Sequence, residues 1–135
     1  MLIPGLVVLA IASACSCTPK HASAAPGPFA AQAEHVIADL AAGNFQTVYG
    51  MFDASAKAQI SVAALANGWQ VYQEEFGSYR GHGSPEFIPV GSLDVEQVPM
   101  FMAKGTQLAR VTYEPDGAIA GLLLLKAGAP PPSAS

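Results

Sequence analysis

Residues 107–125 read QLARVTYEPDGAIAGLLLL, and the architecture of the chain is clearest in this stretch. Two segments rich in apolar residues, 107–113 and 118–125, flank Pro115, Asp116 and Gly117. Proline and aspartate favour a tight turn, and glycine supplies the positive φ that such turns need. The stretch therefore predicts two antiparallel strands joined by a hairpin.

The second of these strands carries four consecutive leucines, at positions 122–125. Successive side chains of a strand point to opposite faces of the sheet, so this run is apolar on both faces. We expect the strand to be buried on both sides, or to meet a partner on its outer side.

Two further strands are expected upstream, at residues 87–90 and 93–103, where apolar residues recur with a period of two. Gly91 and Gly105 separate these strands from each other and from the hairpin. Pro99 falls within the second strand and has no N–H for a ladder hydrogen bond. We therefore expect an edge, a bulge or a bend at that position.

The first half of the chain shows the 3.6-residue period of amphipathic helices. Three apolar stripes recur at spacings of three and four: Phe29, Ala33, Val36, Ile37 and Leu40; Phe45, Val48, Tyr49 and Phe52; Val62, Leu65, Trp69, Tyr72 and Phe76. Gly43 ends the first helix, Ser61 is suited to cap the third, and Gly77 ends the third. Helices followed by strands predict an α+β fold, with three helices packed on one face of a four-stranded antiparallel sheet.

Length and charge limit the class of protein. The chain has 135 residues, enough for one domain of ordinary size, and 51% of them are hydrophobic. Its net charge is −4, from 6 basic and 10 acidic residues. Nucleic-acid interfaces and membrane-binding patches need clustered Lys and Arg, so we expect neither here.

The N-terminus resembles a targeting signal. Residues 2–11 read LIPGLVVLAI, an apolar run of signal-peptide length, whereas a membrane-spanning helix needs about 20 residues. Ala12, Ser13, Ala14 and Cys15 follow, and they resemble the bacterial lipoprotein box, in which cleavage exposes a cysteine that is then lipidated. The resemblance implies a signal peptide at 1–14 and lipidation of Cys15.

A lipidated Cys15 would tether the protein to the outer face of the cytoplasmic membrane, because several acyl chains hold stably where one does not. Cys17 is the alternative site, but Cys15 would then lie inside the box of Cys17. No cysteine follows Cys17, so we expect no disulfide, zinc-thiolate site or cysteine nucleophile in the folded part.

Segments rich in Pro, Ala and Ser border the patterned part of the chain. Residues 15–28 read CSCTPKHASAAPGP, and residues 127–135 read AGAPPPSAS. Neither segment has an apolar period, so we expect a flexible stalk at 15–28 and a disordered tail at 127–135. The folded domain is therefore expected at 29–126.

Several short motifs in the domain agree in order and spacing with a known family. They are Ala42-Gly43-Asn44-Phe45, Phe52-Asp53 with Lys57, then Leu65, Trp69 and Gly77, and finally residues 111–122, VTYEPDGAIAGL. Over residues 31–125 the chain resembles domain-of-unknown-function family 3887, a nuclear-transport-factor-2-like (cystatin-like) domain of secreted bacterial proteins. The resemblance implies a cone, in which three helices wrap a curved sheet and leave a pocket at the open end. It brings no catalytic residues with it.

No complete catalytic motif is present. The chain has neither the G-x-S-x-G nor the S-x-x-K motif of serine nucleophiles. Three histidines, His21, His35 and His82, are spread along the chain, the last in an expected loop at 80–83. We expect them to be solvated, and we expect neither a metal site nor a cofactor.

A proton-transfer pair is the sharper catalytic hypothesis, because some cone folds are isomerases or dehydratases. Such chemistry needs an Asp with a His or Tyr facing the pocket, and Asp53, Tyr49, Tyr72 and His82 are the candidates. In the alternative interpretation, Asp53 caps or turns the chain after the second helix, and the tyrosines pack with their hydroxyls at the rim.

Large side chains gather at a few positions of the expected helices and strands. Tyr49, Trp69, Tyr72, Met100 and Met102 are our candidates for the lining of an apolar pocket, with methionine as an adaptable wall. The alternative is that these residues form the core of a domain that has few large side chains.

We therefore expect a non-catalytic, membrane-anchored binding or interaction module outside the cytoplasm. The family often precedes an α/β-hydrolase domain or stands alone as a lipoprotein, so an extracytoplasmic enzyme or a second copy of the chain is the expected partner. A carrier or sensor of a small hydrophobic ligand is the second hypothesis, and a small isomerase or dehydratase is the third.

Replacing Cys15 by Ala tests the anchor. The variant is expected to be released from the membrane or to remain unprocessed, because no thiol is left to carry the lipid. Fractionation of cells and the mass of the protein report both outcomes, with Cys17→Ala as the control. A Cys15→Ala protein that is mature and still membrane-bound would show the anchor hypothesis to be wrong.

Overall fold

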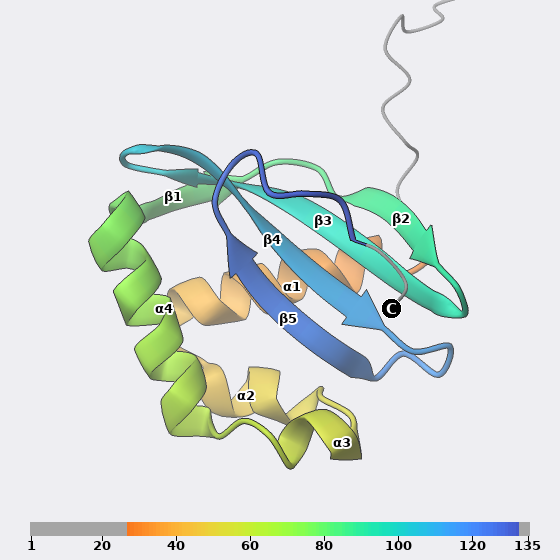
Figure 1. Cartoon of the computed structure of the whole chain (residues 1–135). Helices are drawn as coiled ribbons and strands as arrows, with labels where there is room; N and C mark the ends of the chain where they lie inside the picture. The colour runs from red at the N-terminus through yellow and green to blue at the C-terminus, as the bar shows by residue number, and fades with distance from the viewer. Residues whose placement is uncertain (1–26, 133–135) are drawn as a thin grey trace, which may run out of the picture.

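The computed structural model describes residues 27–132. Four helices are followed by five strands (Figure 1): α1 (Ala30–Ala42), α2 (Phe45–Gly50), α3 (Ala54–Lys57), α4 (Val62–Phe76), β1 (Tyr79–His82), β2 (Glu86–Val90), β3 (Leu93–Met102), β4 (Gly105–Tyr113) and β5 (Ile119–Leu125). The predicted α+β class is confirmed. The expected signal peptide at 1–14, Cys15 and nearly all of the stalk lie outside the described residues, as do residues 133–135.

The structure has one helix and one strand more than the three helices and four strands expected from the pattern. The extra helix, α3, is four residues long, so its sequence ASAK is too short to show a helical period. The extra strand, β1, has the sequence YRGH, which contains neither alternation nor a β-branched residue. Both elements depend on contacts with distant parts of the chain.

Helix boundaries follow local signals. Gly43 ends α1 in the left-handed region, at φ 82°, where glycine carries no steric penalty. Ser61 caps α4, because its hydroxyl accepts a hydrogen bond from the Ala64 amide at 3.0 Å. Asp53 caps α3 in the same way, through the amide of Ala56 at 2.7 Å. The predicted capping roles of Ser61 and Asp53 are therefore confirmed.

All pairings in the sheet are antiparallel, and the strand order is β1-β3-β4-β5. β2 also pairs with β3, on the edge that β1 occupies further along. Pro99 lies on β3 at the junction between these two partners, where its carbonyl accepts from the Gly83 amide. Pro99 has no N–H to donate back to this partner strand, and β1 ends and β2 begins beside it, so the irregularity expected at the proline falls between the two short edge strands.

The hairpin between β4 and β5 forms as predicted. The Glu114 amide donates to the Ala118 carbonyl at 2.9 Å, and the Gly117 amide donates to the Glu114 carbonyl at 2.8 Å. Gly117 has φ 93°, and the Asp116 carboxylate accepts from the Ala118 amide at 2.9 Å. Each turn residue thus has the role that its type favours.

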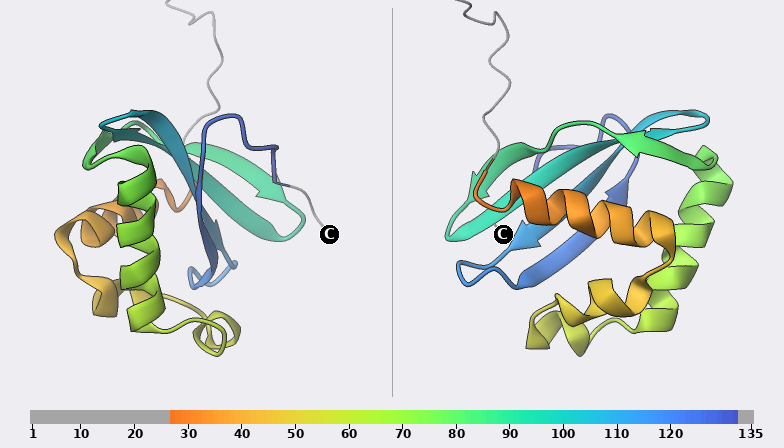
Figure 2. Two further views of the ribbon diagram at one scale, coloured as in Figure 1. Left: turned by 60° about the vertical axis from the view of Figure 1, so that its left-hand side comes forward. Right: turned by 180° about the vertical axis from the view of Figure 1, so that it is seen from behind.

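The helices cover one face of the sheet. Figure 2 shows α1 lying across this inner face, with α2 below it and α4 running along one end of the strands. The residues of the hydrophobic core come from both layers: Ala33, Val36, Ile37, Leu40, Val48, Phe52, Leu65, Trp69, Tyr72, Val98, Met100, Met102, Ala109, Val111, Tyr113 and Ile119. The packing of one helical layer on one sheet face explains the buried side of each strand.

The chain after β5 turns back over the outer face of the sheet (Figure 1). The Ala127 amide donates to Gln107 Oε1 at 2.6 Å. Residues 129–132, which belong to the segment expected as a disordered tail, line a hollow on this face together with Val95 and Leu125. Part of the apolar outer face is thus in contact with the chain's own C-terminal segment.

Within residues 27–132, none of the helices combines the length and the apolar character that crossing a membrane requires.

Trp69→Ala is expected to lower the free energy of unfolding by about 3–5 kcal/mol, because a buried indole leaves a cavity when it is removed. Trp69 is only 5% exposed and packs against the rings of Tyr72 and Tyr79. Urea denaturation measures the change. Val71→Ala on the same helix is the control, because Val71 is half exposed and should change stability by less than about 1 kcal/mol. An equally small loss for Trp69→Ala would contradict the core role.

Candidate functional site

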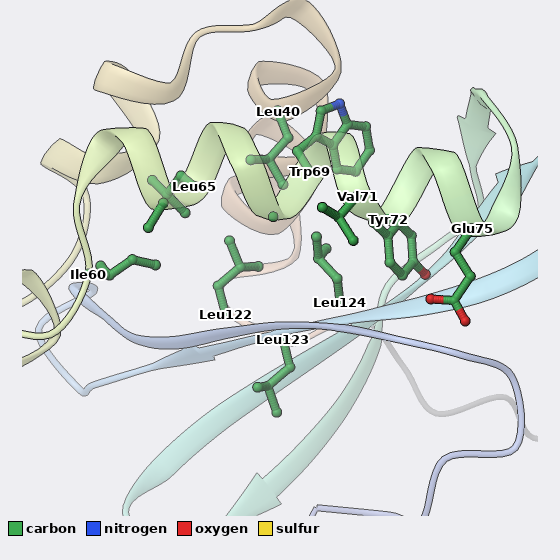
Figure 3. A pocket seen from close by; sticks show the side chains of 12 residues that line it. Leu40, Ile60, Leu65, Trp69, Val71, Tyr72, Glu75, Leu122, Leu123 and Leu124 are labelled. Carbon is green, nitrogen blue, oxygen red and sulfur yellow. The ribbon is translucent and has the colours of Figure 1, made fainter.

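The largest apolar hollow beside the helices lies between α4 and β5 (Figure 3). Its volume is about 350 Å³. Its lining comes from both elements and from two neighbouring segments: Leu40, Ile60, Ala64, Leu65, Gly68, Trp69, Val71, Tyr72, Glu75, Leu122, Leu123 and Leu124. A single charged residue, Glu75, belongs to this set.

The periodicities of α4 and β5 explain why this lining is apolar. Leu65, Trp69 and Tyr72 recur at helical spacing and face the sheet from α4. Figure 3 shows Leu122 and Leu124 pointing from β5 toward α4, whereas Leu123 points the other way. Because strand side chains alternate, a run of leucines supplies both the inner wall of the hollow and, at Leu123, an apolar residue at its rim that points to the other face of the sheet.

The rim of the hollow is also apolar. Val71 on α4 is 50% exposed and Leu123 on β5 is 53% exposed, and both line the hollow. Exposed apolar residues at the mouth of an apolar hollow are typical of a binding site.

One end of the hollow is polar. The Tyr72 hydroxyl donates a hydrogen bond to the Leu125 carbonyl at 2.6 Å, which joins α4 to the end of β5. Burial raises the pKa of Tyr72 far above its usual value, and the nearby Glu75 carboxylate adds to this effect. Tyr72 therefore stays neutral, and Glu75 is the charged group at this end.

A second hollow of about 260 Å³ continues the first along β5. Its lining includes Ala120 and Gly121 of β5, together with Phe52, Ala56 and Gln59. Both hollows contain Ile60 and Leu122, so they adjoin. We call the combined depression along residues 120–124 the β5 trough.

The residues expected to line a pocket fall in three places. Trp69 and Tyr72 line the β5 trough. Tyr49 is half-buried on α2, where its hydroxyl lies 3.4 Å from the Lys57 carbonyl. Met100 and Met102 lie on β3 in the core, with exposures of 0% and 5%, and they do not line the trough.

The candidates for a proton-transfer pair have separate partners. Asp53 caps α3 and lies near Glu114. The Ala56 amide lowers the pKa of Asp53, whereas the proximity of Asp53 raises the pKa of Glu114. Tyr49 and Tyr72 bond to backbone carbonyls, as described above. The described contacts therefore do not join Asp53 to a tyrosine or a histidine.

His82 is not in a solvated loop, as the sequence predicted, but on β1 in a hydrogen-bonded chain. Its Nδ1 lies 2.9 Å from the Tyr79 hydroxyl, and its Nε2 lies 3.1 Å from Glu34 Oε2 on α1. Glu34 is 48 residues away in sequence, so no local pattern could have revealed the contact. The hydrogen-bonded chain of Tyr79, His82 and Glu34 borders a shallow hollow that is also lined by Ala31, His35 and Ala38.

Within residues 27–132, no group of three or more His, Cys, Asp or Glu side chains lies close enough together to hold a metal ion.

A buried acid lies apart from the trough. Glu96 on β3 is 0% exposed, and neither of its carboxylate oxygens has a hydrogen-bond partner among the described residues. Burial raises the pKa of Glu96, and the amides of Gly27 and Phe29 at the start of α1 oppose that shift. The hydroxyl of Tyr113 is also buried without a partner among these residues, and the Glu96 charge helps raise its pKa.

A family model described as "Protein of unknown function (DUF3887)" matches residues 33–122. The match runs from α1 to β5 and includes most residues of the trough. No curated protein and no solved structure matches the chain.

Glu96→Gln is expected to stabilise the protein at pH 7 by roughly 1–2 kcal/mol, because the buried carboxylate becomes neutral. The raised pKa of Glu96 means that its folded form keeps a proton to higher pH than its unfolded form. The contribution of Glu96 to the free energy of unfolding is therefore most favourable below the ordinary carboxyl pKa, and it is lost as pH rises through the raised pKa of the folded protein.

The gain for Glu96→Gln should therefore vanish near pH 4 and grow toward neutrality, as measured by urea denaturation at several pH values. Glu86→Gln on the neighbouring strand is the control, since Glu86 is exposed. A gain of Glu96→Gln that does not change with pH would contradict the burial of an unpaired acid.

Proposed function

The chain belongs to the DUF3887 family of proteins of unknown function, and we propose that it is a non-catalytic binding module. In this proposal the β5 trough takes up an apolar group. The domain acts outside the cytoplasm, tethered through Cys15 to the outer face of the cytoplasmic membrane. An extracytoplasmic enzyme, a second copy of the chain or a small hydrophobic ligand would be its partner.

The observation that carries the proposal is the apolar trough itself. Its larger part has a volume of about 350 Å³, within the range of about 300–1,000 Å³ found for ligand sites. Leucines line it from both sides, and Val71 and Leu123 extend the apolar surface to its rim. Apolar surface left in water is costly, so a partner that covers it gains binding free energy.

The position of the trough agrees with the cone that the resemblance implied. We propose that the sheet and helices form a nuclear-transport-factor-2-like cone whose open end is the trough. The inner core is filled by side chains such as Val98 and Met100, both 0% exposed. The space left for a ligand is therefore beside β5 and not at the centre of the sheet.

A binding role is also favoured over proton transfer by the chemistry of the trough. Tyr72 is bonded to a backbone carbonyl and holds its proton, and Glu75 has no histidine or tyrosine hydrogen bond among the described residues. The Tyr79–His82–Glu34 chain combines groups that can hold a proton, but it borders a shallow surface hollow. Catalytic sites usually exclude water more fully than such a hollow does.

Uptake of N-phenyl-1-naphthylamine, a neutral apolar dye that fluoresces when it leaves water, tests the proposal. Gly68 lines the trough, and a Cβ added to it meets no atom within 4 Å. Gly68→Phe should therefore fill the trough without disturbing the core and weaken dye binding at least tenfold.

Gly50→Phe is the matched control, because Gly50 also has no neighbour within 4 Å of an added Cβ but does not line the trough. It should leave dye binding unchanged. Dye binding that is absent in the wild type, or equal in the wild type and Gly68→Phe, overturns the proposal.

A further inference from the structure

The outer edge of β5 is unpaired over most of its length. β5 is the last strand in the order β1-β3-β4-β5, and its other edge pairs with β4. Only its first residue has a partner on the outer side: Ile119 exchanges backbone hydrogen bonds of 2.9 Å with Met51 and Asp53. Among the described residues, no other strand pairs with this edge beyond Ile119.

This edge also lacks the features that usually prevent strand addition. Natural edge strands carry Lys, Pro or inward charges, or they are very short. β5 has the sequence IAGLLLL, with no charge and no proline, and its one register irregularity lies at its start. The opposite edge differs, because β1 carries Arg80 and β2 carries Glu86 and Pro89.

The trough runs beside the unpaired edge and not across it. Its two parts adjoin at Ile60 and Leu122 and together follow residues 120–124. Five residues of a strand extend over about 16 Å at ~3.3 Å per residue. A long, narrow, apolar depression next to free backbone donors and acceptors is the geometry that binds an extended peptide.

We propose that the β5 trough binds an extended segment of a partner protein, which adds to the sheet along β5. This inference rests on the proposed function and specifies its ligand. Main-chain hydrogen bonds to β5 provide affinity, and alternate apolar side chains enter the space between Leu122, Leu124 and α4. Figure 3 shows that these two leucines point toward α4.

Charge selects the kind of segment. Glu75 is the one charged residue in the larger part of the trough, and the whole chain has a net charge of −4. A segment with Lys or Arg at the Glu75 end gains an ion pair, whereas a second copy of this acidic chain would bring another Glu75 close to the first. α4 forms the other wall of the trough, opposite β5. A second copy that added to the edge of β5 would also have to fit its own α4 into the space beside that edge. The observations therefore favour a basic, apolar segment of another protein.

Selection from a displayed library of random 12-residue peptides on the full chain tests the inference. Enriched peptides should alternate apolar residues and contain Lys or Arg. A synthetic copy of the most enriched peptide should bind at least tenfold more weakly to Gly68→Phe and equally well to Gly50→Phe. Glu75→Gln should weaken it several-fold and reduce the dependence of binding on salt.

Hydrogen exchange separates strand addition from simple burial of side chains. The bound peptide should slow exchange of those backbone amides within residues 120–124 that point away from β4, because strand addition gives them acceptors. Failure to enrich any peptide over the Gly68→Phe background, or binding without this protection, overturns the inference. If the apolar dye still binds the wild type and not Gly68→Phe, the proposed function stands and only the peptide ligand is wrong. If the wild type binds neither the dye nor any peptide, both the proposed function and this inference are wrong.

Discussion

Nine residue pairs, from Asp94–Tyr113 to Met102–Gly105, hold β3 against β4, and the rest of the structure depends on this register. The register places Val98 and Met100 on the face that packs against the helices. It places Gln97 and Arg110 on the outer face, where they share a hydrogen bond of 2.8 Å. A shift of one residue would exchange these faces, moving the core side chains to the outer face and turning the polar ones toward the helices.

The β5 trough follows from the way α4 meets this sheet. α4 is joined to the strands by the bond between Tyr72 and the Leu125 carbonyl and by the packing of Trp69 on Tyr79. Leu65 of α4 and Leu122 of β5 both line the hollow between these two elements (Figure 3). The apolar surface there comes from the side chains of two well-formed elements that leave a hollow between them.

The two edges of the sheet have opposite character. Charged residues and a proline protect the edge formed by β1 and β2, as in most stable monomeric sheets. The edge formed by β5 is apolar, uncharged and open after Ile119. Such an edge is an aggregation hazard unless a partner covers it, so its retention is easier to explain for a binding protein than for an isolated domain. The Glu96 carboxylate on β3 is buried without a hydrogen-bond partner among the described residues, and it lies near the start of α1 and away from this edge.

The amino-acid sequence by itself determined the α+β class, the longer helices, the hairpin around Gly117 and the caps at Ser61 and Asp53. These features are local, because periodicity, capping and positive φ depend on neighbours in the chain. Only the tertiary structure decided that α3 and β1 form, since four residues carry too little pattern to predict either. It also decided that Trp69 and Tyr72 border the trough, whereas Met100 and Met102 are enclosed by the core. The contact of His82 with Glu34 and the open edge of β5 arise only when segments far apart in sequence are brought together. No spacing along the chain encodes which faces of two distant elements meet, or which remain uncovered.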